Sequence, residues 1–359
     1  MRASLGDLEL AKLYAPPGVR LTGGARQLEV DVEVTRGEVA PGSAVRLTPA
    51  SVAVRTEDIT VRAPLGVVLE ARPEGPRGHL RAEVRTAGKV EVSADRRSLP
   101  VEVGLLTVAA TTSHRSFAEE LSLAGLEADL RRATVALRDA APWAPKDMTL
   151  AGGTVELSAS VRDQKGQRSA TAAAKLETAA VEVGDVRVGG DGSVALELTQ
   201  ERPEAPARGS LRIDLSTVGV RSGEATATSP LRLDGTVEVD AARNSARMPF
   251  RLRGPSGDVI AASLGQAPWL VRLGTGLLVG AAAEADGIVS VDGGGVALRV
   301  AQARAGGLTA RGALRAGSGP VRGAWLVRSG VLSVGLRHTP DGLAPQLFAS
   351  EGWLAEQLR

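Results

Sequence analysis

Residues that could perform chemistry are few and widely separated in this chain. His114 lies beside Ser113 and near Ser116, which are the residue types of a serine–histidine catalytic pair. No Gly-x-Ser-x-Gly nucleophile turn surrounds these serines, and no acidic residue stands at a recognisable spacing to complete a triad. We therefore interpret His114, together with His79 and His338, as a surface histidine.

Two glycine-rich segments resemble ligand-binding motifs. Residues 274–280 have the spacing G-x-G-x-x-x-G, which differs from the G-x-G-x-x-G of dinucleotide sites and lacks a surrounding βαβ pattern. Residues 189–192, Gly-Gly-Asp-Gly, resemble one turn of a calcium-binding nonapeptide but occur once, so we interpret them as a tight turn. The chain has no Cys and 3 His, which leaves few soft ligands for a metal. The sequence predicts no catalytic residue, no metal site and no cofactor, and so a protein that is not an enzyme.

Charged residues are interleaved along the whole chain. The balance is 43 Lys and Arg against 41 Asp and Glu, without the concentrated positive stripe of a nucleic-acid binder. Glu29, Asp31 and Glu33 alternate with apolar residues, as do Glu238 and Asp240, so we expect these carboxylates on a solvated face and not in a paired-carboxylate active site. We expect no nucleic-acid partner.

The elements that must position any site are strands, because apolar and polar residues alternate almost everywhere. Turn-forming clusters such as Pro41-Gly42-Ser43 and Asp292-Gly293-Gly294-Gly295 separate the runs. The pattern predicts a long antiparallel meander of about 16 to 22 strands. The runs begin with residues 28–35, 45–47, 52–54, 80–85, 90–92 and 101–103, continue with 155–157, 181–183, 194–198, 211–215, 231–233 and 237–239, and end with 289–291, 296–300, 308–314 and 331–336.

Helical spacing is limited to two segments, residues 263–283 and 345–359. We expect the second helix to close the open edge of the sheet. The expected domains are residues 1–262, which form β-groove repeats, and residues 263–359, a C-terminal β segment with a capping helix.

Aromatic residues make up only 2% of a chain that is 43% hydrophobic, so Val, Leu and Ala must line the inner face. An ordinary β-sandwich fills its core with wide aromatic side chains. The expected fold class is therefore mostly β: a long antiparallel meander curled into an elongated groove, with minor terminal helices.

Segments such as LEVDVEV, GSLRIDLSTVGV and PLRLDGTVEVDAARNSARMPFRL are similar in style to the periplasmic AsmA-like and TamB-like proteins of Gram-negative bacteria. The resemblance implies a bridge-like lipid transfer protein whose β-groove carries phospholipid between envelope membranes. It also implies a location in the periplasm or cell envelope, anchored through a membrane segment that this sequence lacks. A complete chain beginning at Met1 would instead be cytoplasmic.

The expected function is non-enzymatic carriage of phospholipid or another acyl-chain ligand, with inner- or outer-membrane proteins as further partners. Two alternatives remain open: a structural or adhesive envelope protein with a closed core, and a module that holds one hydrophobic ligand near Trp269 and Trp325. The predicted groove lining comprises Leu28, Val30, Val32, Val34, Val52, Val54, Val101, Val103, Val155, Leu157, Val194, Leu196, Ile213, Leu233, Val237 and Val239.

Overall fold

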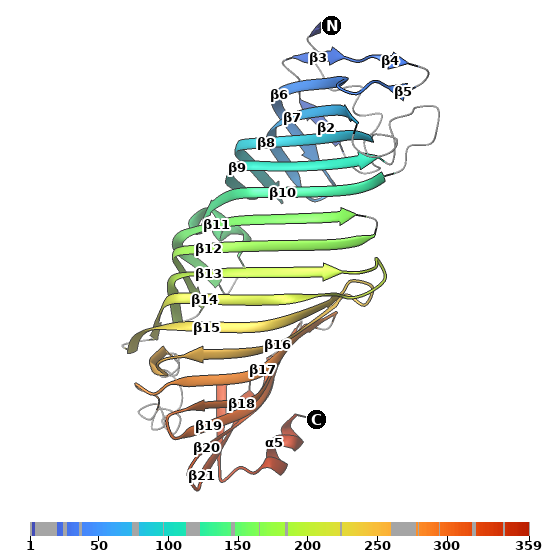
Figure 1. The fold of residues 1–359 in the computed structure, drawn as a ribbon. Coiled ribbons are helices and arrows are strands. Elements are labelled where there is room, and N and C mark those ends of the chain that lie inside the picture. Colours follow the sequence, from blue (N-terminus) through green and yellow to red (C-terminus); the bar gives the residue numbers. More distant parts are fainter. Residues whose placement is uncertain are drawn as a thin grey trace. The chain divides into compact units, whose positions relative to one another are not determined.

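The fold is that of a computed structural model, drawn in Figure 1. The residues that the structure describes are 2–3, 20–23, 27–35, 38–73, 79–95, 97–112, 123–144, 148–164, 166–183, 186–222, 225–259, 278, 280–293, 295–317, 321–339 and 342–358.

Strands dominate the described residues and follow one another as an antiparallel meander, which confirms the predicted fold class. The early strands are β1 (Arg2–Ala3), β2 (Arg20–Gly23), β3 (Leu28–Asp31), β4 (Val34–Thr35), β5 (Glu38–Val39), β6 (Ala44–Arg55), β7 (Thr60–Arg72), β8 (His79–Ala94), β9 (Arg97–Thr112), β10 (Leu123–Ala136) and β11 (Met148–Gln164). The later strands are β12 (Gln167–Val183), β13 (Val186–Gln200), β14 (Ala207–Ser222), β15 (Ala225–Asp240), β16 (Ser245–Gly254), β17 (Ala283–Asp292), β18 (Gly295–Ala305), β19 (Leu308–Ala316), β20 (Arg322–Ser329), β21 (Leu332–Thr339) and β22 (Gly342–Leu347). The described helices are α2 (Leu137–Ala140), the 3-10 turn η1 (Ala141–Trp143) and α5 (Glu351–Gln357).

The chain packs as two compact units. The N-terminal unit comprises residues 1–144 and 154–174, and the C-terminal unit comprises residues 145–153 and 175–359. These units divide the chain within β11 and β12, whereas the expected functional boundary at residues 262/263 stays a prediction.

Within some strands the apolar residues switch from odd to even positions, and a β-bulge at the switch keeps them on one face of the sheet. In β14, Leu211, Ile213 and Leu215 occupy odd positions, whereas Val218 and Val220 occupy even ones. Leu215 pairs with Leu231 of β15 and Val218 pairs with Ser229, so two residues of β14 oppose one of β15. An extra residue shifts the side-chain alternation by one and returns the apolar residues to the same face. Similar register shifts occur in β6, β9, β10 and β18.

Glycines make room for the aromatic rings of the C-terminal unit. A Cβ added to Gly287 would lie 2.7 Å from the ring of Phe250, and one added to Gly312 would lie 2.8 Å from the ring of Trp325. Each ring therefore occupies the space beside a glycine of the neighbouring strand that a Cβ would fill. The few wide side chains are accommodated without a second sheet above them.

Two sequence predictions about the strands and turns are wrong. Residues 28–35 do not form one strand: β3 ends at Asp31, Val32 lies outside any strand, and Val34 belongs to β4, which pairs with β5 in a separate two-stranded sheet. Gly189–Gly192 are not a turn but part of β13, because the backbones approach closely there: a Cβ on Gly190 would lie 1.6 Å from the carbonyl oxygen of Thr217. The turns at Pro41–Gly42 and around Asp292 are confirmed.

The C-terminal helix is shorter than predicted and lies on a face of the sheet, not at its edge. Pro345 is in β22, and α5 begins only at Glu351, after Ser350, whose side chain accepts a hydrogen bond from the backbone N–H of Trp353. Leu354 and Trp353 pack on Ala324 and Leu326 of β20. The other predicted helix lies outside the described residues over 263–277, and Ala283 begins β17.

Candidate functional site

The apolar face of the C-terminal unit carries a row of apolar side chains that crosses consecutive strands. Ile213 pairs with Val194 on one side and with Leu233 on the other, and the row continues through Leu252 and Ala285. Directly paired residues point to the same side of a sheet. The row then passes through Ala303, Ala310, Val327 and Val334 and reaches Leu347 in β22.

The N-terminal unit has a row of the same kind. Leu28 pairs with Leu47 of β6, which pairs with Val67 of β7, and the row ends at Val161 of β11. Its intermediate members are Val84, Val108 and Ala128. Both units therefore carry an apolar face built from aliphatic side chains.

Large side chains on these faces remain partly open to solvent. Seven of them are between 36% and 45% exposed. They are Val108, Leu126, Leu157 and Val161 in the N-terminal unit and Val188, Val291 and Val296 in the C-terminal unit. A single exposed valine is ordinary, but several on the same face of one sheet make that face a candidate contact surface.

Other parts of the apolar faces are covered. In the C-terminal unit, Val259 packs on Val218 and Val220, and Leu278 packs with Ala283 and Ala305. In the N-terminal unit, Val39 of β5 packs on Ala71 and Leu80, and Val90, Val103 and Ala133 form a buried cluster with Ala63. The faces thus combine covered and uncovered stretches.

The opposite face of the C-terminal unit carries ion pairs that run between neighbouring strands. Arg212 Nε lies 3.2 Å from Asp234 Oδ1, and Arg251 Nε lies 2.7 Å from Asp286 Oδ1. The hydrogen bond from Arg232 lowers the pKa of Asp234, and the same contact raises the pKa of Arg232. These side chains are exposed, so their ion pairs keep this face hydrated and contribute little to stability.

The structure places most of the predicted lining residues on the apolar faces. In the N-terminal unit these are Leu28, Val30, Val52, Val54, Val101, Val103, Val155 and Leu157, each paired with an apolar residue or a glycine. In the C-terminal unit they are Val194, Leu196, Ile213, Leu233, Val237 and Val239. Val32 and Val34 lie away from the main sheet and are exposed.

Most of the residues that suggested chemistry fall on segments that the structure does not describe. They are Ser113, His114 and Ser116 of the serine–histidine pair, Gly274 to Leu277 of the glycine-rich segment, and Trp269. His79 and His338 lie on strands β8 and β21 and are half-buried. Across the described residues, no group of three His, Cys, Asp or Glu side chains is placed to hold a metal ion.

Sequence reasoning missed a charged hollow on the polar face of the N-terminal unit. Long side chains of β8 and β10 flank short ones of β9, Ser160 and Arg162 of β11 complete the lining, and the cavity volume is about 560 Å³. The available signal was the contrast between the charged outward residues of β8 and the short uncharged Thr107 and Ala109 of β9. The register that sets these residues side by side could not be read from the pattern alone.

Comparison with known proteins identifies no relative: no family model, curated protein or solved structure matches this chain. Among the described helices, none is long and apolar enough to span a membrane.

Proposed function

We propose that this chain carries phospholipid or another acyl-chain ligand along the apolar faces of its sheet, in the cell envelope and without a covalent step. The observation that supports the proposal is the aliphatic row through Val194, Ile213 and Leu233, which crosses strand after strand while charged residues occupy the other face. Partial exposure of Val161, Val188 and Val296 adds to it.

The energetics of such carriage are favourable. Each CH₂ group of an acyl chain removed from water gains about 0.8 kcal/mol. The nine pairings from Val194 to Leu347 span about 43 Å along the sheet at about 4.8 Å per strand. One leaflet of a bilayer is about 15 Å of hydrocarbon, so the row has room for more than one chain end to end. Aliphatic side chains make few directional contacts, which favours movement over tight retention.

Native mass spectrometry with lipid extraction, on protein purified under gentle conditions, tests the proposal directly. Several phospholipids per chain are expected. A single stoichiometric ligand would indicate a pocket, and the absence of any lipid, together with no uptake of a fluorescent phospholipid, would contradict carriage.

A pair of adjacent substitutions separates the two faces. Leu196→Asp places a carboxylate on the apolar face, opposite Leu211, and should lower fluorescent phospholipid uptake about tenfold because a charge is costly against acyl chains. Ala195→Asp adds the same charge on the exposed charged face, opposite Arg212, and should leave uptake unchanged. Thermal melts establish that both variants fold, and equal loss of uptake in the two would refute the assignment of faces.

The packing of Val259 and Leu278 on the apolar face favours one alternative, a structural envelope protein whose core is closed. In that case the Leu196→Asp variant would lose stability while the parent protein binds no lipid.

A further inference from the structure

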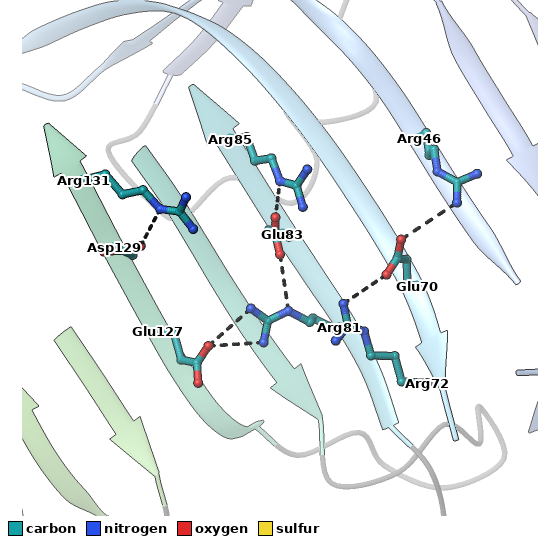
Figure 2. Close-up of polar contacts among 9 residues, drawn as sticks. All are labelled: Arg46, Glu70, Arg72, Arg81, Glu83, Arg85, Glu127, Asp129 and Arg131. Carbon is teal, nitrogen blue, oxygen red and sulfur yellow. Dashed lines mark hydrogen bonds and ion pairs between the residues drawn. The ribbon is translucent and has the colours of Figure 1, made fainter. Parts of the chain in front are cut away.

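The charged hollow lies on the polar face of the N-terminal unit, where Figure 2 shows arginines and carboxylates of β7, β8 and β10 side by side. Thr107 pairs with Arg85 of β8 and with Asp129 of β10, and Ala109 pairs with Glu83 and Glu127. The long side chains of the two outer strands thus stand on either side of the short side chains of β9. This size difference creates the hollow.

The distance between its walls suits a small anion. Residues of β8 and β10 that pair with the same residue of β9 are two strand spacings apart, or about 10 Å. A tetrahedral oxyanion fits between the guanidinium groups of Arg85 on β8 and Arg131 on β10, and Arg162 lines the same hollow from β11, the strand next to β10. The cavity volume of about 560 Å³ also leaves space for a group attached to that anion.

The carboxylates of the hollow are already engaged by the protein. Glu83 accepts hydrogen bonds from Arg85 on one oxygen and from Arg81 on the other. Glu127 accepts from both terminal nitrogens of Arg81 at 3.3 Å and from Gln164 Nε2 at 3.3 Å. These contacts hold Arg81, which is only 20% exposed, in the centre of the network.

The arginines, in contrast, retain unused donors. Arg162 of β11 pairs with Glu127 in register and lines the hollow, yet within the described part of the chain it forms no ion pair or hydrogen bond. Arg131 donates only from Nε, to Asp129 Oδ2 at 3.3 Å, which leaves its terminal nitrogens to bind elsewhere. The short contact of Arg85 with Glu83 likewise uses only Nε. Four arginines face three carboxylates, so the lining has one positive charge in excess.

We propose that this hollow binds a phosphate monoester, with Arg162 as the principal ligand and the terminal nitrogens of Arg85 and Arg131 as further donors. The planar fork of arginine matches phosphate oxygens in pairs of charge-assisted hydrogen bonds. The ester comes either from a soluble metabolite or from a lipid headgroup. The site lies on the face opposite to the aliphatic rows, so its failure would leave lipid carriage untouched.

Isothermal titration calorimetry of the full chain with sn-glycerol 3-phosphate tests the soluble source, and glycerol alone is the neutral control. Flotation with phosphatidylcholine vesicles, with and without phosphatidic acid, tests the headgroup source. Binding in the first experiment identifies a soluble ester, and binding to phosphatidic acid vesicles alone identifies a headgroup.

Arg162→Gln should weaken whichever binding is seen about tenfold, because one charge-assisted pair is lost. The matched control is Arg212→Gln in the C-terminal unit, which removes an arginine already paired with Asp234 and should change affinity less than about twofold. Thr107→Phe fills the hollow without changing any charge and should also abolish binding. Three outcomes would overturn the proposal. They are equal weakening by Arg162→Gln and Arg212→Gln, binding that survives Thr107→Phe, and no binding to either probe.

Discussion

Both units contain β-bulges that shift the side-chain alternation by one residue, but different side chains surround the bulges in each unit. In the N-terminal unit, the bulges of β9 and β10 lie beside the charged hollow. There Arg81 and Arg85 both form ion pairs with Glu83. In the C-terminal unit, the bulge of β14 lies against Gly190 and Gly192 of β13, with the two backbones in close contact.

The contrast shows that alternation of polar and apolar residues fixes which face a residue takes, but not what that face can do. Long side chains around short ones leave a cavity, whereas glycines let neighbouring backbones close the space. Asp191 completes the second arrangement: it accepts hydrogen bonds from the backbone N–H of Thr178 at 2.7 Å and from Thr217 Oγ1 at 3.1 Å, and so joins β12 to β14 across β13.

The largest effect should come from filling the backbone contact in the C-terminal unit. Gly190→Ala would bring a methyl group against the Thr217 carbonyl, so β13 and β14 must separate or shift register, at a cost of about 3 kcal/mol or more in the free energy of unfolding. Urea denaturation measures it. Gly293→Ala, where a Cβ meets nothing within 4 Å, is the control and should be nearly silent. Similar values for both would mean that the close approach does not hold the register.

A smaller loss should follow from breaking the charged network of the N-terminal unit. Glu83 is 8% exposed, and Glu83→Gln removes the negative charge that Arg81 and Arg85 share, at a cost of about 2 kcal/mol. Asp234→Asn makes the corresponding change on the exposed face of the C-terminal unit and should barely alter the melting temperature. A larger effect at Asp234 than at Glu83 would reverse the comparison.

The smallest effect should appear in the pH dependence. Burial raises the pKa of Glu83, but hydrogen bonds and positive charge from Arg85 and Arg81 outweigh it, so the pKa lies below its usual value of 4.5. Folding therefore favours the ionised form, and this stabilisation is present above pH 4.5 and lost as the pH falls through the lowered pKa. Melting temperatures between pH 6 and pH 3 should fall less steeply for Glu83→Gln than for the parent. Parallel curves would contradict the role of Glu83.

The sequence predicted the strands and the face of residues such as Ile213 and Leu233, because a half-buried strand repeats every two residues. The bulge at Ser216 and Thr217 also had a local signal in the sequence: two polar residues separate Leu215 from Val218, where strict alternation would place one. Gly189–Gly192 misled the prediction because glycine is common both in turns and where strands approach closely.

The hollow could not be predicted because it depends on which residues of β8, β9 and β10 lie opposite one another. That register is set by bulges such as the one at Gly104 and Leu105, whose size the alternating pattern does not specify. The prediction of one continuous strand through Val32 and Val34 was wrong for a related reason, since β3 ends at Asp31 and Val34 belongs to the separate pair of β4 and β5.

The meander has a consequence for how the protein folds. From β6 to β11 and from β13 to β22, every described pairing joins strands that are consecutive in the chain. Most of these pairings therefore need only the turn between two consecutive strands to close, and loop closure costs little entropy at each step. Such a sheet can grow one hairpin at a time from any nucleus, as stacked repeats do, and each completed strand becomes the template for the next as the chain emerges during synthesis.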